Sequence, residues 1–293
     1  MKNQHIRHNR FAMITGASSG IGKAIAEELA RYRTNLLLVA LPGTGLEDVG
    51  EELRVKYDVK VHTVCINLLD KDAAQEVFRF SLEHQVRVNI LVNNAGFGNL
   101  ELFEQSRIEE LTSMIELNNR ALVSLTHIFL PMLKKNKHSY VLNVGSLASL
   151  FPIPGKAIYS ATKSFVYCFS AALRQEMKNS SISVSCLCPG ATLTSARVLN
   201  NMNLTSVKAN VFVQKPEQVA REAVNGMFDK TFRIIPGLHN RLLFMLWRIL
   251  PSSISSGILQ RVFAKSISAK RRPTTNLMSG SRSYSFTSAL VQR

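Results

Sequence analysis

TGASSGIG occupies residues 15–22, begins at the last residue of the short apolar run Arg10–Thr15 and leads into a stretch of helical period. Glycines in such a turn let the backbone bend sharply and approach a ligand closely. The N-terminus of the helix that follows has unpaired N–H groups and a positive dipole end, which favour a phosphate group. The spacing is G-x-x-x-G-x-G rather than the commoner G-x-G-x-x-G, and a tight strand-to-helix turn without a ligand would also explain it.

Short apolar runs alternate with amphipathic stretches along most of the chain, a pattern typical of a parallel sheet with helices on both faces. Seven strands are predicted, over Arg10–Thr15, Asn35–Ala40, Val59–Cys65, Asn89–Val92, Ser139–Val144, Ile182–Cys188 and Thr231–Ile235. Six helices are predicted, over Ile21–Tyr32, Leu46–Tyr57, Lys71–His84, Ile108–Lys134, Ile158–Met177 and Pro216–Phe228. The expected fold class is α/β, a doubly wound parallel seven-stranded sheet in one domain with a C-terminal helical extension. Functional residues are then expected in the loops that follow the strands.

A phenol and an ammonium stand four residues apart in the sequence Tyr159-Ser160-Ala161-Thr162-Lys163, on one face of a predicted helix. A free tyrosine has a pKa of about 10 and exchanges protons poorly at neutral pH. Because a nearby ammonium favours the phenolate, we expect Lys163 to lower the pKa of Tyr159 toward the range where proton transfer is efficient. Helices also carry such pairs by chance, with both side chains in solvent.

Ser146 follows the strand that ends Asn143-Val144-Gly145, where a ligand-facing loop is expected to begin. Its hydroxyl can donate a hydrogen bond to a carbonyl oxygen and stabilise the charge that develops there on reduction. The alternative is that Ser146 caps the segment that follows.

These motifs together resemble those of the short-chain dehydrogenases/reductases. The resemblance covers Phe11 to Ile235, and it is carried in order by the glycine turn, Asn93-Asn94-Ala95-Gly96, Asn118, Ser146, Tyr159, Lys163 and Pro189-Gly190. It implies a Rossmann-type NAD(P)-binding catalytic domain over residues 1–238. It also implies an oxidoreductase that transfers a hydride between nicotinamide and a carbonyl or alcohol group.

The resemblance implies a role for each matched residue. Tyr159 would protonate the carbonyl oxygen, and Ser146 would orient it. Lys163 would hold the nicotinamide ribose and Asn118 would connect Lys163 to solvent through a water, whereas Asn93 is expected to join strands rather than to contact the cofactor. The residues expected to bind cofactor are Gly16, Ser18, Ser19, Gly20, Ile21, Gly22, Asn67, Leu68, Asn94, Ala95, Gly96, Tyr159, Lys163, Pro189, Gly190, Thr192 and Thr194. No metal is expected.

The cofactor type is expected to depend on the end of the second strand, Leu38-Val39-Ala40-Leu41. NAD-selective relatives commonly carry an acidic residue there and many NADP-selective relatives an arginine, but this chain has neither. Because no carboxylate at this position would repel a 2′-phosphate, and Ser18, Ser19 and Lys23 are near, NADP(H) is favoured over NAD(H). Asn67 stands where many relatives have Asp, and it can still bond an adenine amine.

The net charge is +16, and no acidic residue follows Asp229. Residues 266–293 are rich in Ser, Thr, Arg and Lys without apolar period, which predicts a basic disordered tail. This tail is either a solvated extension or an element attracted to anionic membrane or an acidic partner. No signature of a nucleic-acid-binding module accompanies the charge, so no nucleic acid partner is expected. Without a recognisable signal peptide, membrane span or disulfide framework, a cytoplasmic protein is expected, with peripheral membrane contact as an open alternative.

Residues 239–265 form an apolar extension, which can pack on the domain, cover a substrate cleft, pair subunits or lie on a membrane. Residues 198–212 stand where the family has its mobile substrate loop. We therefore expect a small lipophilic ketone or aldehyde as substrate, with a 3-oxoacyl thioester or a steroid-like ketone as leading examples, and the resemblance implies a homo-oligomer. The alternative function is a non-catalytic NAD(P)-binding scaffold or redox sensor, against which the complete set of Ser146, Tyr159 and Lys163 argues.

Overall fold

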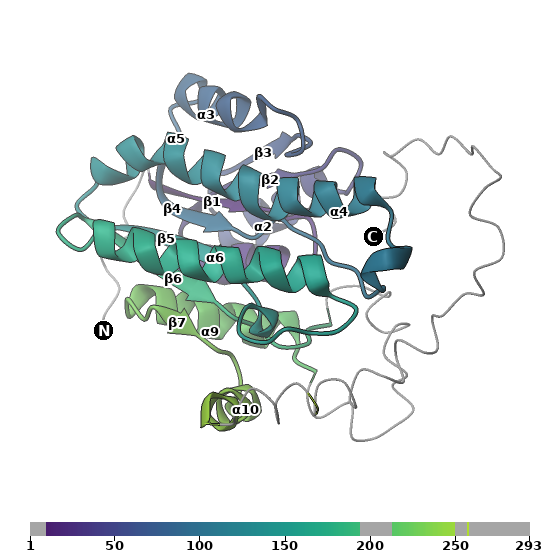
Figure 1. The fold of residues 1–293 in the computed structure, drawn as a ribbon. Helices are drawn as coiled ribbons and strands as arrows, with labels where there is room; N and C mark the ends of the chain where they lie inside the picture. The colour runs from purple at the N-terminus through teal and green to yellow at the C-terminus, as the bar shows by residue number, and fades with distance from the viewer. Residues whose placement is uncertain (1–9, 194–212, 250–256, 258–293) are drawn as a thin grey trace, which may run out of the picture.

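A computed structural model describes residues 10–193, 213–249 and 257, and its centre is one parallel sheet (Figure 1). Its seven strands stand in the order β3-β2-β1-β4-β5-β6-β7. They are β1 (Arg10–Thr15), β2 (Asn35–Ala40), β3 (Val61–Cys65), β4 (Arg87–Asn93), β5 (Ser139–Val144), β6 (Ile182–Leu187) and β7 (Arg233–Ile234). The chain winds outward in both directions from β1 and β4, which creates a crevice at their carboxyl ends where such sheets bind ligands. The predicted fold class is confirmed.

Helices cover both faces of this sheet (Figure 1). One face packs against α1 (Gly20–Arg31), α2 (Leu46–Tyr57) and α9 (Pro216–Phe228). The other face packs against α3 (Ala73–Glu83), α5 (Leu122–Lys134) and α6 (Ala157–Glu176). Strand β1 shows the period-two alternation that this requires, because Ala12 and Ile14 face the first core and Phe11 and Met13 the second.

The long helix predicted over Ile108–Lys134 is divided into three parts. Helix α4 (Ile108–Ile115) leads into a π-helical segment, η2 (Glu116–Ala121), and α5 continues from it. Hydropathy does not reveal this change, because all three parts keep the same buried side. Such π segments are frequent at functional sites, and this one contains Asn118. Two short 3₁₀ turns, η1 (Phe103–Gln105) and η3 (Leu147–Ser149), follow β4 and β5.

Helix α10 (Leu238–Ile249) follows β7 and lies at one edge of the domain (Figure 1). The Asn240 side chain fixes its first turn, because Nδ2 donates hydrogen bonds to Pro236 O at 2.8 Å and to Gln214 Oε1 at 2.9 Å. The predicted extension over residues 239–265 is thus seen as helix up to residue 249. Its remainder apart from residue 257, the tail from residue 266 and the loop over 198–212 lie outside the described residues, and the boundary at residue 238 stays a prediction. Within the described part of the chain, no helix is long and apolar enough to cross a membrane.

Candidate active site

The glycine turn joins β1 to α1 at the carboxyl edge of the sheet. Gly16 and Gly20 have φ values of +65° and +55°, in the left-handed region that favours glycine. A Cβ on Gly22 would lie 2.2 Å from the carbonyl oxygen of Gly16, so the turn and the helix approach more closely than any side chain allows. The first turn of α1 holds no acidic residue, and the N-cap Ser19 makes no side-chain capping bond within the described structure. This open, positive helix end fits the pyrophosphate of a dinucleotide.

Asn94 fastens the glycine turn to the end of β4. Its Nδ2 donates hydrogen bonds to Thr15 O at 2.8 Å and to Gly16 O at 3.1 Å. In return, Thr15 Oγ1 accepts from the backbone N–H groups of Asn94 at 3.0 Å and Ala95 at 2.9 Å. Because the amide of Asn94 is occupied by the protein, its first task is to shape the turn, and its expected contact with adenosine stays a prediction.

Asn93 joins neighbouring elements, as expected. Its Nδ2 donates to Thr126 Oγ1 at 2.9 Å and to Asn143 Oδ1 at 2.8 Å, which connects β4 to α5 and to β5. Asn143 continues the chain of bonds by donating to Ser170 Oγ of α6 at 2.9 Å. The sheet is thus tied internally to the helix that carries Tyr159.

Asn118 connects the π-helical segment to the loop after β4 and to α6. Its Oδ1 accepts from Phe97 N at 3.0 Å, and its Nδ2 donates to Phe97 O and to Thr162 Oγ1, both at 3.0 Å. A Cβ on Gly96 would lie 2.6 Å from Asn118 Oδ1 and 3.4 Å from Lys163 Nζ. Asn118 and Lys163 therefore meet at Gly96, and the expected water link between the two side chains stays a prediction.

Lys163 is buried at 6% exposure and points its ammonium at the end of β5. Its Nζ donates a hydrogen bond to Val144 O at 2.9 Å. Burial lowers the pKa of Lys163 from 10.5 to about 8, while the nearby Cys186 and Cys188 act in the opposite direction. The side chain therefore carries its charge at neutral pH at a free-energy cost, as is common in functional sites.

Ser146 caps the segment that follows it, one of the two roles considered for it, and its role toward a carbonyl oxygen stays a prediction. As N-cap of η3 it accepts a hydrogen bond from Ala148 N at 3.1 Å, and its own N–H donates to Ser149 Oγ at 3.1 Å. Its hydroxyl also hydrogen bonds to the phenol of Tyr159. The cap fixes the position of the Ser146 hydroxyl, and the bond to Tyr159 places two polar groups side by side after β5.

The expectation that Lys163 lowers the pKa of Tyr159 is wrong for this structure. Burial of the phenol raises the pKa of Tyr159, and the hydrogen bond to Ser146 only opposes that rise. Lys163 Nζ is directed at Val144 O instead and lies 5.9 Å from the centre of the tyrosine ring. A second ammonium, Lys156 Nζ, lies 5.3 Å from the same ring centre, and it could not be predicted from helical spacing because Lys156 precedes the predicted helix.

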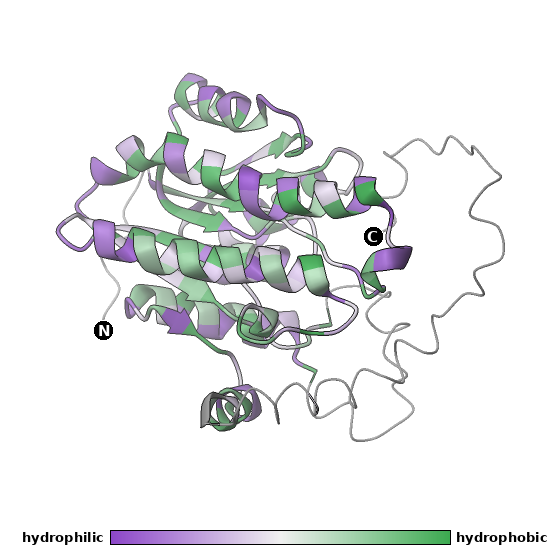
Figure 2. Ribbon diagram, viewed as in Figure 1, coloured by the Kyte–Doolittle hydropathy of each residue, from purple (hydrophilic) through white to green (hydrophobic). Residues whose placement is uncertain are grey.

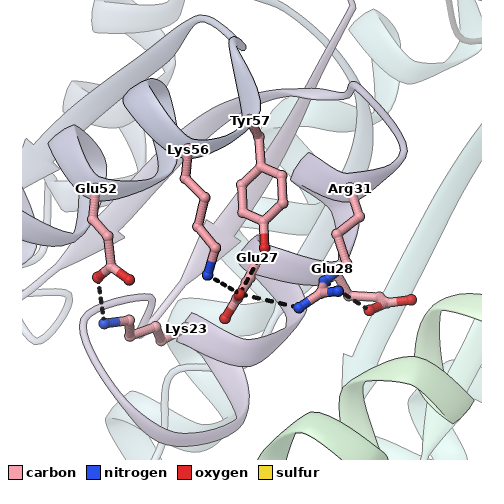
Figure 3. Close-up of polar contacts among 7 residues, drawn as sticks. All are labelled: Lys23, Glu27, Glu28, Arg31, Glu52, Lys56 and Tyr57. Atoms are coloured by element: carbon pink, nitrogen blue, oxygen red, sulfur yellow. Dashed lines mark hydrogen bonds and ion pairs between the residues drawn. The ribbon is translucent and has the colours of Figure 1, made fainter.

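A carboxylate that was not predicted from the sequence lies beside the end of β2. Glu47, in the first turn of α2, accepts a hydrogen bond from Cys65 Sγ at 2.8 Å, and Cys65 is paired with Ala40 across the two strands. Lys23 forms an ion pair with Glu52 at 2.8 Å, within a cluster of charged side chains that joins α1 to α2 (Figure 3). Lys23 is therefore less available to a 2′-phosphate than its position in the sequence indicates.

Asn67 and Leu68 follow β3 on the same side of the crevice. Asn67 Oδ1 accepts from Leu69 N at 3.1 Å and so stabilises its own turn. Leu68 is buried, and its carbonyl oxygen accepts from the Arg120 guanidinium at 3.3 Å. The turn is well fixed, and its contact with adenine stays a prediction.

The loop after β6 closes the opposite side of the site. Pro189 O accepts from Leu147 N at 2.9 Å, which attaches this loop to the Ser146 segment. Thr192 is buried and donates to Gly190 O at 3.1 Å. A Cβ on Gly190 would lie 2.8 Å from the Asn240 amide, so α10 rests directly on the loop. Thr194 lies outside the described residues.

Residues 10–204 match the family model described as short chain dehydrogenase. The chain belongs to the short chain dehydrogenase family. Members of this family are NAD(P)-dependent oxidoreductases that act on CH–OH or C=O groups, which confirms the expected enzyme class. Among the described residues of this short chain dehydrogenase, no group of His, Cys, Asp and Glu is arranged to hold a metal ion.

Named relatives differ in what they act on. The chain is 32% identical over 184 residues to the very-long-chain 3-oxoacyl-CoA reductase-A of Danio rerio, a match that covers 61% of this chain and 57% of that protein. It is 34% identical over 189 residues to sulfoacetaldehyde reductase 2 of Chromohalobacter salexigens, which covers 63% of this chain and 73% of that protein. A short-chain dehydrogenase from Sphingobium yanoikuyae, solved in complex with NADPH, is similar in structure with a TM-score of 0.71 and 28% identity, over 92% of this chain and 99% of that one.

Proposed function

We propose that this short chain dehydrogenase transfers a hydride between NADP(H) and a lipophilic carbonyl or alcohol compound, with 3-oxoacyl thioesters and steroid-like ketones as the leading substrate classes. The observation that carries the proposal is the meeting of Ser146, Tyr159 and Lys163 beside the loop that contains Gly96 and Gly98. A Cβ on Gly98 would lie 2.3 Å from the ring of Tyr159, so this loop is in close contact with the phenol. When bound, the nicotinamide supplies or accepts the hydride.

Tyr159 is in the protonation state that a proton donor requires. A tyrosine with its ordinary pKa of about 10 is protonated at neutral pH, and burial, which raises the pKa of Tyr159 further, keeps it so; an acid must start in this form before it protonates the oxygen of a carbonyl group during reduction. Ser146 orients that oxygen through its hydroxyl, whose position the cap of η3 fixes. Lys163 would hold the ribose of the bound cofactor with its ammonium, and Asn118 positions the loop at Gly96 against α6.

A lipophilic substrate is supported by the apolar side chains near the crevice. Phe151, five residues after Ser146, is buried against Trp247 of α10, with ring centres 4.8 Å apart. The relative that reduces very-long-chain 3-oxoacyl-CoA, as its name says, acts on a substrate of the proposed kind. The other curated relative is named for a small polar aldehyde, so the choice rests mainly on the apolar surroundings of this site.

The proposed preference for NADP(H) is supported by Ala40 and Leu41, where a carboxylate that would repel the 2′-phosphate is missing from the sequence. The structural relative solved with NADPH is consistent with it. Glu47 and the pairing of Lys23 with Glu52 act against it, so the preference is expected to be small.

Pairing of two copies is proposed to involve α4 and α6. Helix α6 exposes Phe165, which stacks on Phe169 at a ring-centre distance of 6.1 Å, together with the thiol of Cys168. Helix α4 exposes Ile108 and Ile115. Apolar side chains gathered on two adjacent helices favour a helical interface.

The proposal is tested by following cofactor absorbance with a panel of ketones and 3-oxoacyl thioesters of graded chain length. Oxidation of NADPH is expected, with kcat/KM rising as the acyl chain lengthens. Binding of NADPH without turnover of any carbonyl compound in the panel, or of the matching alcohols with NADP, would contradict the proposal and favour the scaffold or sensor function.

A further inference from the structure

Helix α10 has two faces of different character. The docked face carries Asn240, Phe244 and Trp247, which are buried or half-buried against the domain. Phe244 lies under the guanidinium of Arg233 at 4.2 Å from its ring centre. The face opposite, here called the leucine stripe, consists of Leu238, Leu242, Leu243, Met245 and Leu246.

The leucine stripe is strongly exposed. Leu238 is 71% exposed, Leu246 63%, and Leu242 and Met245 59% each. Its five members account for five of the 11 large hydrophobic side chains exposed in the described chain, although α10 has only 12 residues. Figure 1 shows α10 projecting from the edge of the domain, and Figure 2 shows that apolar residues make up much of this projecting helix. Single exposed leucines are ordinary, but a contiguous apolar stripe marks a surface for a partner.

The position of α10 connects this surface to the active site. Asn240 lies against Gly190 in the loop after β6, and Trp247 packs on Phe151 in the segment after Ser146. Both segments follow strands, β6 and β5, at the carboxyl edge of the sheet, where such sheets bind ligands. A partner held on the leucine stripe would therefore lie beside the entrance to the site.

Charge decides between a lipid surface and a second copy of the chain. Helix α10 has no acidic residue, and residues 250–293 contain seven basic residues and no acidic one. Both copies of the chain would carry this positive charge, which opposes their association, whereas an anionic bilayer attracts the charge and accepts the apolar side chains at once. At about 1.5 Å per residue the 12 described residues of α10 are far too few to cross a bilayer, so this part of the helix would lie in the plane of the interface.

We propose that the leucine stripe of α10 docks the protein on the surface of an anionic lipid bilayer and so presents the mouth of the active site to lipid-dissolved compounds. The apolar stripe enters the boundary between headgroups and acyl chains, and the basic residues that follow strengthen the attachment. Vesicle binding can be read without turnover, so the docking proposal and the proposed reaction can fail separately.

The test compares three full-length proteins by co-sedimentation with vesicles of phosphatidylcholine and phosphatidylserine. The stripe variant carries Leu242→Gln and Leu246→Gln, and the control variant carries Val55→Gln and Leu82→Gln, which are 73% and 56% exposed on α2 and α3. The wild type and the control are expected to bind, more weakly as salt is added, and the partition coefficient of the stripe variant is expected to fall about tenfold or more. Circular dichroism and melting curves check that all three proteins are folded.

Three results would overturn the proposal. The first is a wild type that does not bind these vesicles at any salt concentration. The second is equal binding by the stripe variant and the wild type. The third is a smaller assembly of the stripe variant by light scattering with vesicle binding unchanged, which would assign the stripe to a second copy of the chain.

Discussion

Lys163 gives the structure a pH dependence that can be measured without substrate or cofactor. Its folded-state pKa is about 8, below the ordinary value of 10.5, because the ammonium is buried against Val144 O. Between these two values the unfolded chain keeps a proton that the folded protein has released. The free energy of unfolding of the wild type should therefore rise as the pH increases from about 8 to about 10.5. This gain in stability is lost again as the pH falls through about 8.

The size of the effect follows from the two pKa values. The interval from about 8 to 10.5 corresponds to about 3 kcal/mol in total, of which about 2 kcal/mol is recovered between about pH 7 and about pH 9.5. The variant Lys163→Met keeps the length of the side chain and removes the titrating group. Relative to this variant, the wild type should gain about 2 kcal/mol of stability over that pH range.

Urea unfolding at constant ionic strength measures this difference. The control is Lys178→Met, which removes an exposed lysine just after α6 and should leave the pH dependence of the wild type unchanged. A difference in unfolding free energy between wild type and Lys163→Met that stays flat from about pH 7 to about pH 9.5 would refute the reasoning about burial.

Three further predictions concern the cofactor site and the assembly. Gly22→Ala should weaken NADPH binding at least about tenfold and lower the free energy of unfolding by about 1–3 kcal/mol, because the new Cβ would meet the backbone oxygen of Gly16. Fluorescence titration measures the affinity and urea unfolding the stability, and an unchanged affinity would contradict the tight turn. NADPH should bind more tightly than NADH by a small factor that grows in Glu47→Gln, since that change removes a carboxylate near the end of β2; a titration in which NADH binds clearly better would reverse the assignment. Phe165→Asp should shift the protein toward monomers in light scattering by placing a charge in the proposed interface, and an unchanged mass would exclude α6 from that interface.

The sequence was sufficient to predict the sheet and most helices, because these depend on local hydropathy. Strands β1, β2 and β5 begin and end where predicted, and the order of the elements is as expected. The π-helical segment around Asn118 was missed, since one additional residue in a helical turn leaves the apolar pattern almost unchanged. Strand β7 is shorter than predicted. Only Arg233 and Ile234 pair with β6, and the residues on either side of them are not in the strand.

The matched motifs do meet at the carboxyl edge of the sheet, but the bonds that set their chemistry join residues distant in sequence. The hydrogen bond from Lys163 to Val144 O, the ion pair of Lys23 with Glu52 and the bond of Cys65 to Glu47 all depend on how helices dock on the sheet. Periodicity and spacing do not contain this information. The wrong expectation about the pKa of Tyr159 has the same origin, because a position four residues away on a helix does not determine where a lysine side chain points.

Tyr159→Phe tests the proposed reaction most directly, because it removes the phenolic O–H and keeps the ring in contact with the loop at Gly98. The measurement is the single-turnover rate of NADPH oxidation with the best carbonyl substrate, taken together with the dissociation constant for NADPH. The proposed mechanism predicts that the rate falls by about two orders of magnitude or more while the dissociation constant stays within a few-fold of the wild-type value. A variant that oxidises NADPH at close to the wild-type rate would contradict the assignment of Tyr159 as the proton donor.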